Sequence, residues 1–145
     1  MYLDEIEAGF RFTTPSHEMT EAQILEYAHV YDPQPFHIDR EAAKASIYGG
    51  LIASGLQTCA ICFRLTLAAN IFNEASLGSP GMDRLRWLKP VRPGDVLTVE
   101  GRVTAVARSA SRPDRGRIEV DYVGRNQNGE DVISYSITHM LKCRP

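Results

Sequence analysis

The sequence predicts an α+β protein in which a curved antiparallel β-sheet wraps around one long central α-helix. Two observations lead to this fold class. The stretch from Gly49 to Asn73 is largely apolar and contains Arg64 as its only charged residue. The second half of the chain instead alternates apolar and polar residues with the period of half-buried strands. Antiparallel strands with one apolar face need a cover, and the apolar stretch is the one segment long enough to supply it.

Length and composition limit what the chain can be. Its 145 residues suit a single domain, residues 1–145, that buries a core without metal ions or disulfides. The net charge of −2 gives no sign of binding to nucleic acid or to a membrane surface. The first ten residues, MYLDEIEAGF, carry acidic groups where a secretion signal needs a basic start and an apolar core. We therefore expect a cytoplasmic protein.

Short elements are predicted before the central helix. The segment Phe10–Thr14 (FRFTT) indicates a first strand, and TEAQILEYAHV indicates a helix. Thr20 and Gln23 form a capping-box pattern at the start of this helix. The helix is expected to end near Tyr31, because the residue before a proline is pushed out of the helical region. Asp39 is a candidate N-cap for a second short helix, REAAKAS.

The apolar stretch predicts the central helix itself, LQTCAICFRLTLAANIF. About 18 helical residues would span roughly 27 Å, and a helix that is apolar on nearly all sides is a buried one. A transmembrane span is the alternative, but five polar residues interrupt the stretch: Gln57, Thr58, Arg64, Thr66 and Asn70. Cys59 and Cys62 have the C-x-x-C spacing of redox or metal sites, yet the surrounding TCAICF favours packing.

The second half predicts long strands joined by tight turns. One extended segment covers Arg84–Val91, and the RPGD turn leads to a strand over Val96–Arg108. The segment RIEVDYV alternates in the same way, and Asn128-Gly129 indicates a hairpin that leads to the last strand. The residues predicted to face the helix are Leu97, Val99, Val103 and Ala105 in one strand and Ile133, Tyr135, Ile137, His139 and Leu141 in the last. His139 is therefore expected to be a hydrogen-bonded core histidine.

The stretch YDPQPFHID carries the residues best suited to chemistry. Asp32 and His37 are five residues apart, roughly 16 Å if extended, so their side chains meet only if the segment curls. Pro33 and Pro35 stiffen it. A stiff loop that carries a carboxylate and an imidazole suits general acid–base catalysis. The alternative is a proline turn in which Asp32 caps locally and His37 is merely packed.

A second candidate element, GGLIASG, runs into the start of the central helix. Helix N-termini present unpaired N–H groups and the positive end of the helix dipole. Because glycine permits close approach to the backbone, Gly55 is a candidate oxyanion donor for a polarised carbonyl. The alternative is that the glycines only form a tight turn and that Ser54 caps the helix.

Together these motifs resemble the MaoC-like dehydratases, hotdog-fold proteins that include the (R)-specific enoyl-CoA hydratases. YDPQPFHID, GGLIASG and RLRWLKPVRPGDVL occur in the order of that family, over about residues 9–140. The family motif runs Gly-Asp-x-Asn-Pro-x-His and then Asp. The positions that match it here are Asp32, Pro35, His37 and Asp39. Tyr31 stands where the family has glycine and Gln34 where it has asparagine, so these two residues, with Ser54, would order the loop or contact substrate.

The resemblance implies hydration of a 2-enoyl-CoA to a (3R)-3-hydroxyacyl-CoA, or the reverse reaction. Asp32 and His37 would hold the reacting water as the catalytic pair, and the Gly55 N–H would stabilise the enolate oxygen. No metal or redox cofactor is implied, and the partners would be an acyl-CoA and a second copy, as a homodimer or dimer of dimers. A hotdog thioesterase and a non-catalytic acyl-CoA-binding subunit are the alternatives.

The phosphates of CoA would favour a basic patch near such a pocket. Two groups offer one: Arg84, Arg86, Lys89 and Arg92, and Arg108, Arg112, Arg115 and Arg117. Trp87, within the first group, is expected to pack near an interface.

Overall fold

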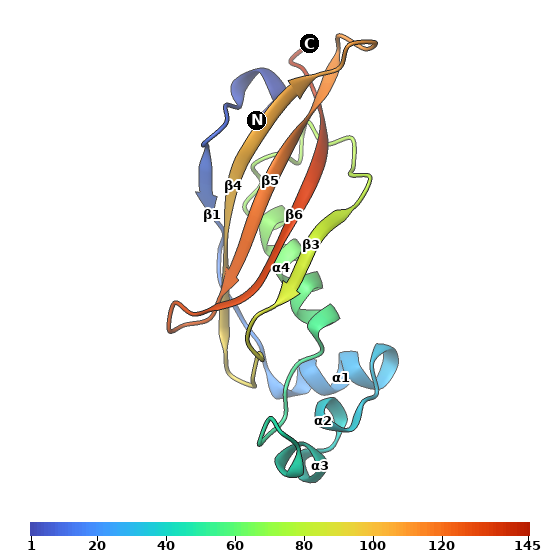
Figure 1. Ribbon diagram of the computed structural model, residues 1–145, viewed down its shortest axis with the longest axis vertical. Helices are drawn as coiled ribbons and strands as arrows, with labels where there is room; N and C mark the ends of the chain where they lie inside the picture. Colours follow the sequence, from blue (N-terminus) through green and yellow to red (C-terminus); the bar gives the residue numbers. More distant parts are fainter.

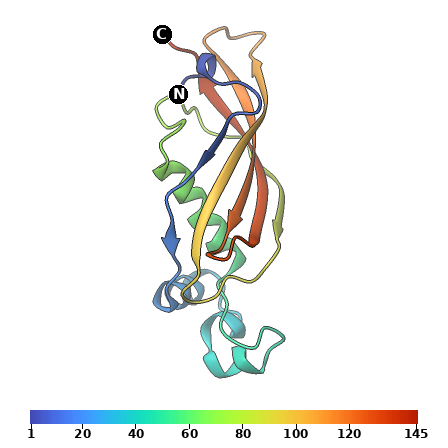
Figure 2. The same cartoon turned by 90° about the vertical axis from the view of Figure 1, so that its left-hand side faces the viewer.

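A computed structural model describes residues 1–145 and has a six-stranded antiparallel sheet on one side of a long helix (Figures 1 and 2). The strands are β1 (Arg11–Thr13), β2 (His17–Glu18), β3 (Met82–Trp87), β4 (Val96–Arg108), β5 (Arg115–Arg125) and β6 (Asp131–Lys142). Their order is β1-β4-β5-β6-β3, and β2 pairs with β4. The predicted fold class, a curved antiparallel sheet around a central helix, is confirmed.

The helices divide between the concave face of the sheet and one end of it. A 3₁₀ turn opens the chain, and the helices are η1 (Leu3–Glu5), α1 (Glu21–Tyr31), α2 (Pro35–Ile38), α3 (Arg40–Ala45) and α4 (Gly55–Ala68). Helix α4 lies along the sheet, whereas α1, α2 and α3 gather at the end where α4 begins (Figure 1). None of these helices is long and apolar enough to cross a membrane.

Two of the predicted helix starts are confirmed. Thr20 accepts a hydrogen bond from the Gln23 N–H, and the Gln23 side chain returns to the Thr20 backbone, which completes the capping box. Asp39 accepts from the N–H groups of Glu41 and Ala42 at the start of α3. Both caps lie within three residues of sequence, so the local pattern alone fixes them.

The central helix differs from its prediction in length. It ends at Ala68, because Asn70 adopts a left-handed φ of 54° and the Asn73 amide caps the Leu67 carbonyl.

The prediction that α4 is buried on nearly all sides is wrong for the single chain. The sheet covers only one side of the helix, and Leu56, Phe63 and Leu67 remain 52%, 37% and 43% exposed on the other.

A bulge corrects one predicted core position in β4. Val103 pairs with Val120 but Ala105 pairs with Glu119, so Thr104 is an extra residue in the strand. An extra residue shifts the alternation of side chains to the opposite face. Val103 is therefore buried, as predicted, whereas Ala105 is exposed.

The extended segment predicted over Arg84–Val91 is also shifted. Strand β3 begins at Met82 and ends at Trp87. A left-handed residue, Arg84 with φ 52°, accompanies a register shift against β6. After Trp87 the chain leaves the sheet, and the backbone N–H of Leu88 donates to the Val132 carbonyl.

The helix packs closely against the sheet at Gly124 of β5. A Cβ added there would lie 2.6 Å from Cγ2 of Ile133 and 2.9 Å from Sγ of Cys62 on α4. Contacts this short force neighbouring groups to move. Gly124 therefore allows α4 to rest directly on the sheet.

We expect Gly124→Ala to lower the free energy of unfolding by about 1–3 kcal/mol, because the added methyl overpacks this contact. Urea denaturation monitored by circular dichroism measures the change. Gly81→Ala is the matched control, since a Cβ there meets nothing within 4 Å. Equal stabilities of the two variants would contradict the close helix–sheet contact.

Candidate active site

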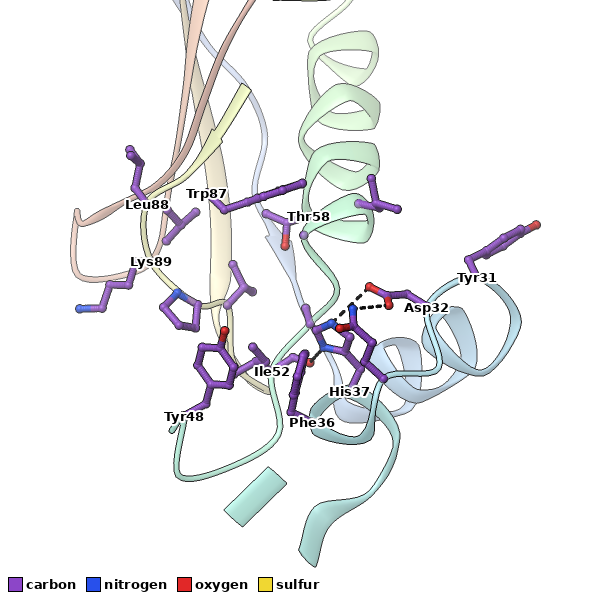
Figure 3. Close-up of a pocket in the computed structure, with 17 residues that line it drawn as sticks. Tyr31, Asp32, Phe36, His37, Tyr48, Ile52, Thr58, Trp87, Leu88 and Lys89 are labelled. Carbon is purple, nitrogen blue, oxygen red and sulfur yellow. Dashed lines mark hydrogen bonds and ion pairs between the residues drawn. The ribbon is translucent and has the colours of Figure 1, made fainter. Parts of the chain in front are cut away.

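A pocket of about 600 Å³ lies where α2, the start of α4 and the end of β3 meet (Figure 3). Five of the residues singled out from the sequence line it: Tyr31, Asp32, Gln34, His37 and Gly55. Ser54 does not line it but hydrogen-bonds Asp32. The structure thus brings all six candidate residues together.

The YDPQPFHID segment curls through a series of short-range hydrogen bonds. Asp32 is the C-cap of α1, and its N–H donates to the Ala28 carbonyl at 2.9 Å. The N–H of Gln34 then donates to the Asp32 carbonyl, and that of His37 to the Gln34 carbonyl. Pro35 occupies the first turn of α2, a position that needs no N–H donor. The turn brings Oδ2 of Asp32 to 3.2 Å from Nε2 of His37.

The Asp32 carboxylate is the centre of this arrangement. Its Oδ1 accepts from the Gln34 amide and its Oδ2 from the Ser54 hydroxyl, both at 2.7 Å. Burial alone would raise the pKa of Asp32, but the hydrogen bonds from Ser54 and Gln34 and the nearby His37 outweigh it and lower the pKa. Asp32 is therefore held as a carboxylate.

His37 is fixed from its other side. The ring is 4% exposed, and Nδ1 lies 2.7 Å from the Ile52 carbonyl. A carbonyl only accepts, so Nδ1 carries the proton and donates. Nε2 is then the ring nitrogen presented to Asp32 and to the pocket. Phe36 packs edge-on against the His37 ring, with the two ring centroids 4.6 Å apart, and also packs against Tyr48.

The start of α4 is left open. The alternative in which Ser54 caps this helix does not hold, because its hydroxyl is directed to Asp32 and makes no cap hydrogen bond. The N–H of Gly55 has no acceptor within the chain. A Cβ at this position would lie 2.4 Å from Cε2 of Trp87, so glycine is what lets the indole lie here.

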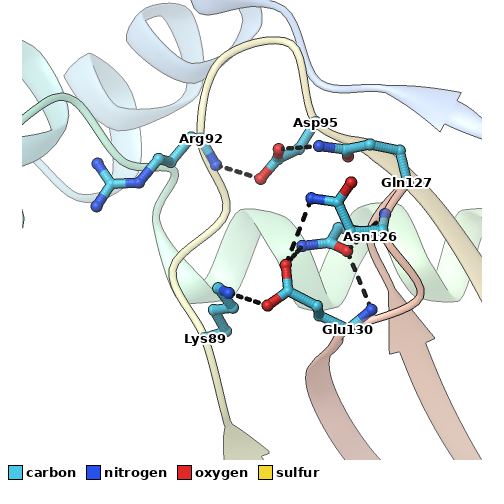
Figure 4. Close-up of polar contacts among 7 residues, drawn as sticks. Lys89, Arg92, Asp95, Asn126, Gln127 and Glu130 are labelled. Carbon is cyan, nitrogen blue, oxygen red and sulfur yellow. Dashed lines mark hydrogen bonds and ion pairs between the residues drawn. The ribbon is translucent and has the colours of Figure 1, made fainter.

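A polar network supports the opposite wall of the pocket (Figure 4). Lys89 forms an ion pair with Glu130, which also accepts from the Asn126 amide. Gln127 donates to Asp95 in the turn before β4. The β5–β6 hairpin thereby holds the segment between β3 and β4 that lines the pocket.

The first predicted basic group reaches the pocket only in part. Lys89 lines it and Arg92 donates to the carbonyl of Tyr48 in its wall, but Arg84 lies on the other face of the sheet with Asp121 and Ser136. Arg108 ends β4 and Arg115 begins β5, and they pair with Asp4 and Asp114. Figure 1 shows this end of the two strands opposite the end where α2 and the start of α4 lie.

The remaining sequence expectations concern the core. His139 is confirmed as a core histidine: it lies 2.7 Å from the Tyr122 hydroxyl, and burial lowers its pKa to about 4. Cys59 and Cys62 are free thiols, and burial raises the pKa of Cys62 to about 12. These values favour packing over redox chemistry for the C-x-x-C pair.

Sequence reasoning missed several groups that shape the site. Phe36 and Tyr48 carry no motif of their own, and the Ile52 group is a backbone carbonyl that no residue pattern marks. Trp87, expected near an interface, lies in the pocket wall. Its place in the motif RLRWLKPVRPGDVL is the one sequence signal that points to it.

Comparison with known proteins identifies the family. Residues 5–126 match the family model described as "MaoC like domain". The chain belongs to the MaoC-like family. A MaoC-like dehydratase from Rhodospirillum rubrum is 38% identical in its crystal structure, with a TM-score of 0.93 over 100% of this chain and 99% of that chain.

Two other relatives extend the comparison. The uncharacterized protein YdeM of Bacillus subtilis (strain 168) is 30% identical over 142 residues, 98% of this chain and 99% of that protein. The (R)-hydratase from A. caviae involved in PHA biosynthesis is 21% identical, with a TM-score of 0.76 over 94% of this chain and 97% of that chain. This last likeness shows the shared fold.

We expect Ser54→Ala to raise the pKa of Asp32, because it removes a donor to the charged carboxylate. Carbon-13 NMR titration of the aspartate carboxyl signals measures this pKa directly. In the wild-type protein the lowered pKa contributes stability above the unfolded value of about 3.9, and this is lost as pH falls through the folded value. Ser54→Ala should therefore weaken that acid-side dependence.

The matched control for this change is Ser16→Ala, because Ser16 hydrogen-bonds Thr98 away from the pocket. An unchanged Asp32 titration in Ser54→Ala would show that the serine hydroxyl does not stabilise the carboxylate.

Proposed function

We propose that this protein is an acyl-CoA hydratase/dehydratase that adds water to a 2-enoyl-CoA to give a (3R)-3-hydroxyacyl-CoA, or catalyses the reverse. The observation that carries the proposal is the Asp32–His37 pair, 3.2 Å apart beside an open helix N-terminus in one pocket. Membership of the MaoC-like family and the 38% identity to a MaoC-like dehydratase support it.

The pair is arranged to activate one water molecule. When the His37 ring is neutral its proton is on Nδ1, so a water bound to Oδ2 of Asp32 and Nε2 of His37 would donate one hydrogen to each. We assign the base to His37: the lowered pKa of Asp32 makes it the weaker base, and its charge stabilises the imidazolium that forms. Asp32 then orients the water and the charged ring.

The balanced reaction returns both groups to their starting states. The water oxygen bonds to C3 as His37 takes a proton, and the C2=C3 electron pair moves toward the thioester oxygen. The imidazolium then gives a proton to C2 as the enolate collapses. The Gly55 N–H, at the positive end of the α4 dipole, would stabilise the enolate oxygen.

The arrangement favours hydration over thioester hydrolysis. Hydrolysis would require the activated water at the carbonyl carbon, yet the open helix terminus is suited to hold the carbonyl oxygen while Asp32 and His37 act elsewhere on the acyl group. The same pocket without turnover would describe an acyl-CoA-binding subunit.

We expect Asp32→Asn and His37→Ala each to lower the hydration rate by roughly 10²–10⁴-fold, the range for loss of a general acid–base group. Loss of the conjugated enoyl-thioester absorbance, over short, branched and long 2-enoyl-CoAs, measures the rate. The matched controls are Asp83→Asn and His29→Ala, which change the same residue types outside the pocket.

The control variants should retain wild-type turnover, and all four should keep the wild-type circular dichroism spectrum. Release of free CoA with the acyl group unhydrated would establish a thioesterase. Acyl-CoA binding that survives Asp32→Asn, with no turnover in the wild-type protein, would establish a binding subunit.

We also propose that the chain forms a homodimer. The exposed side of α4 presents Leu56, Phe63 and Leu67, and β3 leaves one edge of the sheet unpaired. Natural proteins commonly cover such apolar faces and sheet edges by association. A second copy would cover the side of α4 that the sheet does not cover.

Light scattering coupled to size exclusion should give twice the chain mass, and Phe63→Glu should lower it toward the monomer because a charge would be buried in the interface. Ile47→Glu is the control, since Ile47 is also apolar but is 93% exposed in the segment after α3. A monomeric wild-type protein, or dimerisation unaffected by Phe63→Glu, would contradict this interface.

A further inference from the structure

We propose that Trp87 is a further catalytic residue, whose indole N–H donates a second hydrogen bond to the thioester oxygen beside the Gly55 N–H. The inference rests on the proposed hydratase function, since it assigns a donor within the same site. It starts from a large aromatic side chain that is left half-exposed and is therefore not explained by core packing.

Trp87 is a large, mostly apolar side chain at an exposed position. It is the last residue of β3, opposite Ile133 of β6, on the edge strand of the sheet. Its side chain remains 54% exposed yet lines the pocket. Figure 3 shows the ring reaching from the end of β3 across to the start of α4, close to Thr58.

The ring is held at Gly55 by direct contact. A Cβ at Gly55 would lie 2.4 Å from Cε2, 2.5 Å from Nε1 and 2.8 Å from Cδ2 of Trp87. The nitrogen-bearing part of the indole, not its outer edge, therefore lies over this glycine. Any side chain at position 55 would displace the ring from the helix N-terminus.

This contact brings two N–H donors close together. A backbone nitrogen lies about 2.5 Å from the Cβ position of its own residue, so Nε1 of Trp87 and N of Gly55 are within about 5 Å. An oxygen that accepts at about 2.9 Å from each donor fits that separation. Oxyanion holes are commonly built from such pairs of preorganised donors.

Both donors lack a partner in the chain. Nε1 of Trp87 donates to no protein acceptor, and the Gly55 N–H also has none. An indole nitrogen donates only and accepts nothing, so in this half-exposed position it is free to donate to water or to an acceptor atom of a bound molecule. The thioester oxygen, which gains negative charge as water adds to C3, is the acceptor that the proposed reaction supplies.

The decisive variant is Trp87→Phe, which keeps an aromatic ring against Gly55 but removes the N–H. We expect kcat to fall by roughly 10²-fold, the cost of losing one oxyanion donor, with little change in KM. Trp87→His, which restores a ring N–H, should recover part of kcat. If Trp87 acted only through packing, Trp87→Phe would instead change KM, and Trp87→His would not recover kcat.

A second readout does not depend on turnover. In the Asp32→Asn background a bound 2-enoyl-CoA persists, and isotope-edited infrared spectroscopy gives its thioester carbonyl stretch. Adding Trp87→Phe should move that stretch back toward its frequency in water, because one donor is lost. Trp87 is the only tryptophan in the chain, so its fluorescence also reports binding of a saturated acyl-CoA.

These outcomes separate the inference from the function on which it rests. Turnover by the wild-type protein, with kcat and the carbonyl stretch unchanged in Trp87→Phe, would overturn the donor role and leave the hydratase proposal standing. A loss of kcat that histidine does not rescue, with an unchanged stretch, would also overturn it. Absent turnover with a stretch that depends on Trp87 would support the donor and refute the hydratase proposal.

Discussion

The hydrogen bond from Ser54 to Asp32 is the interaction on which the rest of the site depends. It joins the end of α1 to the start of α4 across 22 residues of sequence and lies beside the 3.2 Å contact with His37. Through it one carboxylate fixes three segments: the turn that carries Gln34, the short helix that carries His37, and the N-terminus of the central helix. The same bond, with those from Gln34 and His37, lowers the pKa of the carboxylate.

This bond has a consequence at the helix. A serine before a helix normally accepts from the N–H of the second or third helical residue, but here the hydroxyl turns to Asp32 and leaves those groups uncapped, beside the Gly55 N–H that also has no acceptor. An uncapped helix end costs stability, typically about 1 kcal/mol. In the proposed hydratase the Gly55 N–H at this open helix end would face the substrate oxygen.

The parts of the fold that the sequence predicted are those set by local patterns. The capping residues Thr20 and Asp39 act on groups two or three positions away, and the strand alternation repeats over many residues. Ala105 was misplaced because a bulge depends on how β4 pairs with β5, which no single-strand pattern contains. The exposed face of α4 was missed for a similar reason: apolar composition does not tell a face covered by the sheet from one left for another surface.

The residues of the site fall into the same two groups, those set by a local pattern and those set by contacts between distant segments. Asp32, Gln34 and His37 lie within six residues, so their motif could be read from the sequence, and proline stiffness explains why they meet. The walls come from elsewhere: Tyr48 follows α3, Trp87 ends β3, and Lys89 is held by the β5–β6 hairpin. Contacts between such distant segments exist only after folding, and the Ile52 carbonyl that orients His37 has no side-chain signal at all.

This division also suggests how the pocket can vary without losing its polar centre. A change at Trp87 or Tyr48 alters the volume of the pocket and its donor groups, while the hydrogen bonds from Gln34 and Ser54 to Asp32 remain, because neither bond involves those two walls. A change at Gly55 is different, since any added side chain displaces the indole and disturbs the helix N-terminus together. Gly55 is thus the residue at which the shape of the wall and the geometry of the polar centre constrain each other most directly.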